Sequence, residues 1–224
     1  MRDYFGNLPI VSSMGFMRGI MVLDDCEGTM TWNVSGTGGD DVHDFVTAAA
    51  WQGAKGLHLK TRTTSTGEDD FVTVQKIFDH PASGLLVARL RLCTPDAAKT
   101  KSIIVTLRDD DGSQQYAAAI MLAPATNKIY YLNSAGAYVE LTAIPQTFAN
   151  YNWYTLELAA DCRTHKYLHV RFNGLSADLS AQAMYNDAAT SGRSAQLRLL
   201  VTAAVTGPGE AYMDNIYVGE YLEA

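Results

Sequence analysis

The chain has 224 residues, of which 47% are hydrophobic and 18% charged, so it can build one large core or two small ones. Its 24 acidic and 17 basic residues give a net charge of -7, without a long basic run. Phosphate recognition needs a cationic surface, and this charge therefore disfavours nucleic acid as a partner. The longest apolar run near the start, residues 15–23, is interrupted by Arg18 and is too short to span a membrane.

Residues 1–22 carry few charges and follow no regular period. They lack the basic start and the unbroken apolar stretch of a secretory signal, so we expect the chain to remain in the cytoplasm or in an assembled particle. If a leader has been removed, the protein would instead be extracellular. We predict an extended N-terminal arm that either frays in solvent or packs against a neighbouring subunit.

From residue 23 onward, short β-type runs alternate with turn residues, at the spacing typical of sandwiches and barrels. No linker, repeat or low-complexity tract divides residues 23–224, which predicts a single domain. We predict an all-β fold, a two-sheet antiparallel sandwich. The expected strands are 57–62, 71–78, 85–92, 102–108, 116–122, 128–133, 138–142, 153–160, 167–172, 197–202 and 212–218.

Turn residues place two hairpins in this pattern. One turn lies at residues 109–113, where three aspartates precede Gly112, and the other lies at residues 134–136. Long helical periods are absent, although residues 45–50 could form one helical turn. Residues 177–189 could form a short helix or an irregular crossover.

Cysteine and histidine give no sign of a metal or redox centre. The three cysteines, Cys26, Cys93 and Cys162, are widely separated and form no CxxC pair, so we expect reduced, buried thiols. His165 and His169 would lie roughly 13 Å apart on a strand, too far for one zinc ion.

Residues 152–161, which read NWYTLELAAD, are followed by Lys166 to Gly174 with the sequence KYLHVRFNG. This pair resembles a hairpin common in concanavalin A-like and laminin-G-like jelly rolls. Trp153 would open the first strand, and Asn173-Gly174 would permit the positive φ angles of a tight turn.

Two further segments are similar to the opening and closing strands of jelly-roll carbohydrate-binding modules. They are residues 23–28, LDDCEG, and residues 211–219, AYMDNIYVG. The resemblance implies that the first and last strands lie side by side and that a structural calcium ion could bind there. Its ligands would be Asp25, Glu27 and Asp214, together with backbone carbonyls. Alternatively, these carboxylates start a strand and cap a turn.

The sequence offers no recognisable catalytic set. Jelly-roll glucanases carry paired acids on one strand, whereas Glu157 and Asp161 would lie too far apart to act on one sugar bond. Motifs for a serine nucleophile, a phosphate loop or a metalloprotease are also missing. We therefore expect a protein that is not an enzyme.

Aromatic side chains could instead form platforms for sugar rings. Neighbouring tyrosines such as Tyr130 and Tyr131 must point to opposite faces of a strand, so some rings lie away from the core. The candidate ligand-binding residues are Trp32, Trp51, Tyr130 and Tyr138. A sandwich also uses such rings for ordinary packing and subunit contacts.

These features favour two classes of function. The first is a non-catalytic structural subunit that assembles with itself, for example as a trimer, or with a larger particle. By analogy of fold, this would be a virion protein such as a capsid-decorating or head- or tail-fibre subunit. The alternative is a carbohydrate-binding module from a larger secreted protein, with a glycan as its partner.

Overall fold

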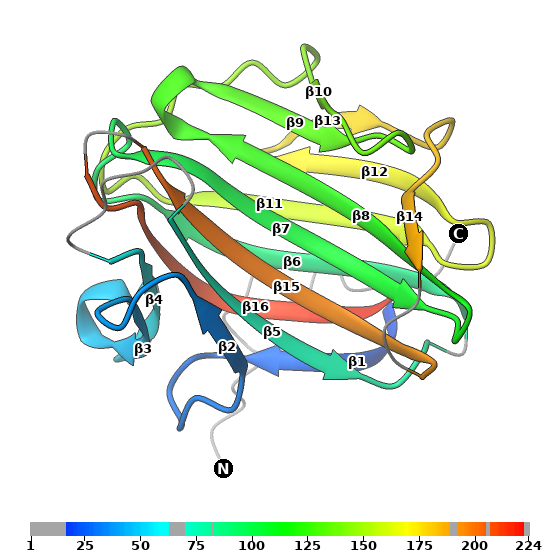
Figure 1. Cartoon of the computed structure of the whole chain (residues 1–224), viewed down its shortest axis with the longest axis horizontal. Coiled ribbons are helices and arrows are strands. Elements are labelled where there is room, and N and C mark those ends of the chain that lie inside the picture. The colour runs from blue at the N-terminus through cyan, green and yellow to red at the C-terminus, as the bar shows by residue number, and fades with distance from the viewer. Residues whose placement is uncertain (1–16, 63–69, 82, 189–191, 205–206, 222–224) are drawn as a thin grey trace.

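Two antiparallel β-sheets stack face to face in the computed structural model (Figure 1). It describes residues 17–62, 70–81, 83–188, 192–204 and 207–221. Sheet A has the order β13-β12-β11-β6-β16-β4-β3, with β1 also beside β16. Sheet B has the order β10-β9-β8-β7-β15-β5-β2, with β14 also beside β8. The predicted all-β antiparallel sandwich is confirmed.

The strands of sheet A are β1 (Met17–Asp24), β3 (Val42–Val46), β4 (Gly56–Lys60), β6 (Leu85–Cys93), β11 (Tyr154–Asp161), β12 (Lys166–Phe172), β13 (Leu175–Asp178) and β16 (Glu210–Tyr221). Those of sheet B are β2 (Asn33–Gly36), β5 (Phe71–Phe78), β7 (Thr100–Asp110), β8 (Gln114–Ala123), β9 (Lys128–Leu132), β10 (Tyr138–Glu140), β14 (Tyr185–Ala188) and β15 (Ser194–Ala203).

Helical structure in the described part of the chain is limited to two 3-10 turns, Thr47–Ala49 and Pro124–Thr126. The first lies inside the expected turn at residues 45–50. None of the described helices has the length and apolar character needed to cross a membrane. Of the two alternatives for residues 177–189, the crossover is correct, because this segment leaves sheet A after β13 and enters sheet B as β14.

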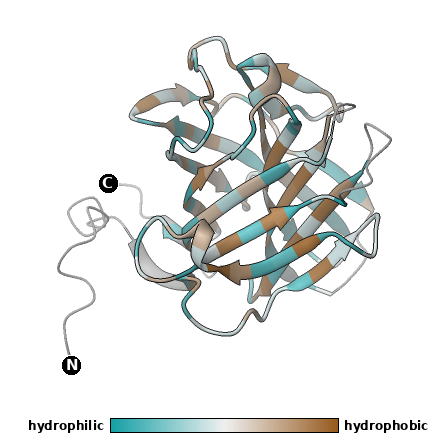
Figure 2. Cartoon of the chain, turned by 90° about the vertical axis from the view of Figure 1, so that its left-hand side faces the viewer, coloured by the Kyte–Doolittle hydropathy of each residue, from teal (hydrophilic) through white to brown (hydrophobic). Residues whose placement is uncertain are grey.

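Alternation along the central strands separates the core from the outer faces, as the hydropathy colours in Figure 2 show. On β7, Ile103, Val105 and Leu107 are buried in the core between the sheets. The intervening positions, such as Ile104 and Arg108, lie on the outer face and are partly exposed. The same alternation on neighbouring strands gives each sheet one apolar face, which explains why the two sheets stack.

The first and last strands lie side by side, as the resemblance implies. β1 pairs with residues 216–221 of β16, and β4 pairs with residues 210–213 of the same strand. Between these two partners β16 has an irregular register, and Asn215 takes a left-handed conformation with φ 49°. The expected arm over residues 1–22 thus includes most of β1, while its residues 1–16 lie outside the described residues.

All three expected hairpins form. β7 and β8 join at Gly112, β9 and β10 join at Gly136, and β11 pairs with β12. The expected tight turn at Asn173-Gly174 joins β12 to β13. Asn173 and Gly174 have φ values of 49° and 84°, the left-handed pair of a two-residue turn.

The Tyr167 hydroxyl crosses from sheet A to hydrogen-bond the backbone of sheet B. It donates to the carbonyl of Leu132 at 2.7 Å and accepts from the N–H of Ala119 at 2.9 Å. At this edge β8 pairs with β14 up to Ala117 and with β9 from Ile120, so Ala119 has no strand partner there. Tyr167 is fully buried and fills this gap in the backbone ladder.

Replacing Tyr167 with phenylalanine keeps the packed ring and removes the hydroxyl. The Ala119 N–H and the Leu132 carbonyl then lose a buried partner, and we expect unfolding in urea to become easier by about 2–4 kcal/mol. Tyr151→Phe is the control, because its side chain is 68% exposed. Equal stability of the two variants would contradict the bridging role.

Candidate functional site

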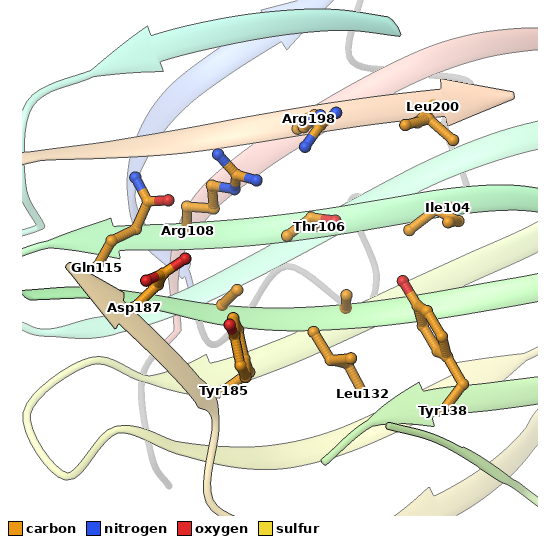
Figure 3. A pocket seen from close by; sticks show the side chains of 12 residues that line it. Ile104, Thr106, Arg108, Gln115, Leu132, Tyr138, Tyr185, Asp187, Arg198 and Leu200 are labelled. Atoms are coloured by element: carbon orange, nitrogen blue, oxygen red, sulfur yellow. The ribbon is translucent and has the colours of Figure 1, made fainter. Parts of the chain in front are cut away.

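A pocket of about 240 Å³ lies on the outer face of sheet B (Figure 3). Strands β7, β8 and β15 form its floor, and β9, β10 and β14 add residues on one side. The lining residues are Ile104, Thr106, Arg108, Gln115, Ala117, Ala119, Leu132, Tyr138, Tyr185, Asp187, Arg198 and Leu200.

Small side chains on β8 make room for this pocket. Ala117 and Ala119 project to the outer face between the larger side chains of neighbouring strands. In register, Ala119 lies opposite Thr106, and Ala117 lies opposite Arg108. Within the sequence Tyr116-Ala117-Ala118-Ala119, the methyl groups of Ala117 and Ala119 therefore form a shallow strip beside the polar residues of β7.

Two tyrosines from edge strands stand beside the floor. Tyr138 opens β10, and Tyr185 opens β14, which pairs with β8 at Ala117. The β9–β10 turn packs against Tyr185, since a Cβ atom on Gly136 would lie 3.1 Å from its ring. Gly136 also has φ 79°, so both its backbone angle and its closeness to the ring favour glycine.

The pocket carries two cationic side chains and one carboxylate. Burial lowers the pKa of both Arg108 and Arg198, and the nearby positive charge of Arg198 lowers that of Arg108 further. Arg198 Nε donates to Thr73 Oγ1 at 3.1 Å. By contrast, Arg108 Nε and Gln115 Nε2 are buried without a hydrogen-bond partner. The described pocket thus offers unused donors.

Two of the four predicted ligand-binding residues lie on this face. Tyr138 lines the pocket, and burial raises the pKa of its hydroxyl. Tyr130 is two residues from Leu132 on β9, opposite Met121, so it shares the outer face. Trp32 is a correction, because it is only 6% exposed and its Nε1 donates to Asp24 at 2.6 Å. A buried indole cannot stack on a sugar.

Trp51 lies near a different depression, on the outer face of sheet A. Its ring is 5.6 Å from that of Trp153, and Arg91 lies 5.0 Å above it. The depression, about 590 Å³, is lined by Trp153 and Arg91 with Arg89, Asn152, Thr155, Glu157, Arg171, Asn173 and Gly174. Ligand binding by Trp51 stays a prediction.

The charged side chains on the outer face of sheet A pair with one another. Glu157 accepts from His169 at 2.9 Å and from Arg171 at 3.0 Å. Glu210 contacts His58 at 2.7 Å and Lys60 at 3.3 Å. The hydrogen bond from His58 is the main cause that lowers the pKa of Glu210. This face therefore differs from the pocket on sheet B, where no ion pair joins Arg108 or Arg198 to the one lining carboxylate, that of Asp187, in the described residues.

The predicted calcium ligands Glu27 and Asp214 both contact the loop at residues 51–55. Glu27 Oε1 accepts from the N–H groups of Ala54 and Lys55, at 2.6 and 3.1 Å. Asp214, fully buried at the irregular part of β16, accepts from Trp51 and Gln52 at 2.8 and 2.9 Å.

Asp25 instead accepts from the N–H of Glu27 at 3.2 Å. Within the described residues, no three histidine, cysteine, aspartate or glutamate side chains are grouped so that they could share a metal ion. Glu27 and Asp214 already accept hydrogen bonds from backbone N–H groups through their carboxylate oxygens. Calcium binding at Asp25, Glu27 and Asp214 stays a prediction.

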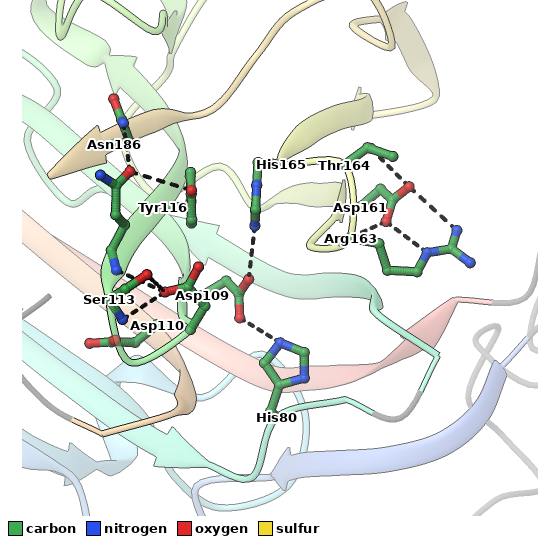
Figure 4. A network of polar contacts seen from close by, with 12 residues as sticks. His80, Asp109, Asp110, Ser113, Tyr116, Asp161, Arg163, Thr164, His165 and Asn186 are labelled. Atoms are coloured by element: carbon green, nitrogen blue, oxygen red, sulfur yellow. Dashed lines mark hydrogen bonds and ion pairs between the residues drawn. The ribbon is translucent and has the colours of Figure 1, made fainter. Parts of the chain in front are cut away.

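A second polar cluster closes one end of the sandwich (Figure 4). Asp109 is 1% exposed and lies 2.8 Å from His80 Nε2 and 3.9 Å from His165 Nε2. Burial raises the pKa of Asp109, while the two histidines act in the opposite direction. The His165 ring stacks on Tyr116 at 3.4 Å between centroids. Sequence spacing does not bring these residues together, because the two histidines come from different loops.

The cysteines are free and buried, as predicted. Burial is the largest cause that raises the pKa of each thiol, to about 12 for Cys93. They are therefore protonated at neutral pH and unreactive.

Sequence reasoning missed Arg108, Arg198 and Gln115. Each stands at an outward position of a central strand, next to a residue that faces the core. Buried Leu107 and Leu197 gave this signal for Arg108 and Arg198, and Tyr116, which packs against the core, gave it for Gln115. The two arginines lie diagonally across β7 and β15 on one face, and this placement depends on strand order and register, which the sequence does not state.

No protein-family model matches the sequence, and no curated protein sequence matches it. Solved structures do match in fold. An endo-β-1,4-glucuronan lyase from Trichoderma reesei superposes with a TM-score of 0.60 at 11% identity, covering 91% of this chain and 95% of the lyase. A cellulose-induced protein gives a TM-score of 0.54 at 11% identity, with 91% and 99% covered.

A carbohydrate esterase from the Shiga toxin-encoding bacteriophage phi24B gives a TM-score of 0.52 at 15% identity, with 86% and 90% covered. Carbohydrate-binding modules also match, at lower TM-scores of 0.41 to 0.46. The chain is a jelly-roll β-sandwich, the architecture that the resemblance implies.

Asp214→Ala removes the acceptor for the N–H groups of Trp51 and Gln52. With a chelator present, we expect this variant to lose about 2–4 kcal/mol of unfolding free energy, because buried donors are left without a partner. Asp25→Ala is the control and should lose only about a few tenths of a kcal/mol, since its hydrogen bond from the Glu27 N–H is exposed to solvent. An unchanged transition for Asp214→Ala would contradict this role.

Calcium is tested separately on the unmodified protein. If the predicted ion binds, calcium at a hundred times its dissociation constant should add about 2.7 kcal/mol of stability over the chelated protein. Identical melting curves with calcium and with chelator would contradict the calcium prediction.

The lowered pKa of Glu210 predicts a loss of stability in acid. Its folded pKa lies below the ordinary 4.5, so the unfolded chain binds the proton more readily, and stability falls as the pH drops below about 4.5. Glu210→Gln should make denaturation midpoints between about pH 5 and pH 3 less dependent on pH. Glu140→Gln, on the exposed strand β10, is the control and should keep the original dependence.

Proposed function

We propose that this protein binds a glycan chain in the pocket on the outer face of sheet B, without cleaving it. The observation that carries the proposal is the combination in one hollow of two tyrosine rings, Tyr138 and Tyr185, with unpartnered polar donors. Aromatic rings contact the apolar faces of sugars, while fixed hydrogen-bonding groups select their hydroxyls.

The solved structures of similar fold support carbohydrate as the ligand class. The glucuronan lyase and the bacteriophage esterase are both named for action on carbohydrates. At 11% and 15% identity, these similarities establish the shared fold alone, so the proposal rests on the pocket residues. A binding module accordingly has better support than the expected virion subunit. Self-assembly and a capsid partner stay predictions.

The acids present count against hydrolysis of the glycan. Glycoside hydrolysis normally uses two carboxyl groups on either side of the bond. Asp187 is the one carboxylate among the residues lining this pocket. The lining therefore supplies contacts for a sugar without the usual hydrolytic pair.

Affinity electrophoresis against a panel of soluble polysaccharides, neutral and acidic, tests the proposal. We expect at least one polymer to retard the protein, and Tyr138→Ala to weaken that interaction by about tenfold, or 1.4 kcal/mol, because a stacking ring is lost. Tyr151→Ala, an exposed tyrosine outside the pocket, should bind like the unmodified protein.

Three results would contradict the proposal. Retardation by no polymer would remove its basis. Loss of binding in Trp51→Ala but not in Tyr138→Ala would place the glycan on sheet A. Shortening of the retarding polymer on incubation, followed by size-exclusion chromatography, would show that the protein is an enzyme.

A further inference from the structure

We propose that the pocket on sheet B recognises a uronate, a sugar residue that carries a carboxylate, through Arg108 and Arg198. This inference rests on the proposed glycan binding and specifies its ligand. The two pocket arginines differ from other arginines of the chain in the partners that surround their guanidinium groups.

Four other arginines of the described structure have a partner close by. Arg62 lies 2.8 Å from Asp70, Arg163 lies 3.1 Å from Asp161, and Arg171 lies 3.0 Å from Glu157. Arg91 lies over the Trp51 ring at 5.0 Å. Pairing of this kind offsets the cost of holding a guanidinium away from water.

Arg108 and Arg198 are placed differently. Across the β7–β15 ladder Arg198 lies opposite Thr106, two residues from Arg108, so both guanidinium groups stand on the same outer face (Figure 3). Within the described residues, no carboxylate oxygen lies within ion-pair distance of either one. Both are partly buried, and their mutual repulsion adds to the cost of desolvation.

Asp187 on β14 is the acidic side chain that lines the same pocket, and it is exposed. Its carboxylate accepts from its neighbour's N–H, that of Ala188, at 2.7 Å. Two guanidinium groups with one carboxylate leave an excess of one positive charge. A ligand with one negative charge per sugar unit would balance it.

The arrangement favours a carboxylate as that charge. A guanidinium presents planar, paired N–H donors that match the two oxygens of a carboxylate. The unpartnered Nε of Arg108 and the unpartnered amide of Gln115 stand beside the same hollow. Tyr138 lines the same hollow as both arginines, which places its ring beside a sugar whose carboxylate they hold.

Isothermal titration calorimetry with two short oligosaccharides of equal length and linkage tests the inference, one of glucuronate and one of glucose. At low salt we expect the uronate oligomer to bind at least about tenfold more tightly, with an advantage that shrinks as salt is added. A sulfated oligomer of equal charge separates carboxylate recognition from general attraction and should bind more weakly than the uronate.

Variants of the pocket give the residue-level test. Arg108→Gln and Arg198→Gln should each weaken uronate binding by about tenfold and weaken binding of the neutral oligomer by much less, because only the uronate loses a charged partner. Arg171→Gln removes the same charge from sheet A and should bind the uronate like the unmodified protein. Asp187→Asn should tighten uronate binding, because it removes the negative charge that repels the ligand carboxylate. This variant tests the inference even if an arginine variant fails to fold, and unchanged or weaker uronate binding would contradict it.

The failure of this inference is distinct from the failure of the proposed function. Equal affinity for both oligomers, lost in Tyr138→Ala but not in the arginine variants, would overturn the uronate and keep glycan binding. Stronger binding of the sulfated oligomer would overturn the choice of carboxylate. If none of the oligomers bound, uronate recognition would be overturned, and the affinity electrophoresis with the wider set of polysaccharides would decide whether the protein binds a glycan at all.

Discussion

The hydrogen bonds of the Tyr167 hydroxyl are the contact on which the outer face of sheet B depends. They reach from a strand of sheet A to the backbone of β8 and β9. Backbone groups in a core must find partners, and strand pairing normally supplies them. Because Tyr167 supplies them at Ala119, β9 and β14 can each pair with a different part of the same edge of β8. The pocket lies beside this junction, on the outer face over β7, β8 and β15.

The two outer faces of the sandwich differ in how their charges are arranged. On sheet A, Glu157 and Glu210 each hold two basic side chains within 3.3 Å, and such closed groups stabilise a surface modestly. On sheet B, the two pocket arginines face one exposed aspartate. Donors without partners cost stability in the free protein, and a ligand that satisfies them recovers this cost on binding. The difference between the faces, more than the net charge of -7, indicates where an anion would bind.

Much of the fold follows from local sequence. Alternation predicted the long central strands but missed β2, β3, β13 and β14 and most of β1. Turn residues predicted the hairpins, and the resemblance of residues 23–28 and 211–219 placed the first and last strands together. The binding surface was only partly predictable. Tyr138 stands on an outer face, as expected for a strand that must turn some of its rings outward, and its role in binding stays a prediction. Trp32 is buried, because sequence cannot show which face of a short segment is covered. Arg108 and Arg198 are 90 residues apart, and only the strand order brings them together.

The floor of the pocket and its walls belong to different parts of the architecture. Central strands β7, β8 and β15 supply the floor, and their opposite faces are the core itself. The walls come from β10 and β14, which have three and four residues and lie at the rim. Changes of sequence in these rim strands would therefore alter the outline of the pocket while leaving the packed interior intact. Such a division lets one scaffold accommodate new ligands through small, local substitutions.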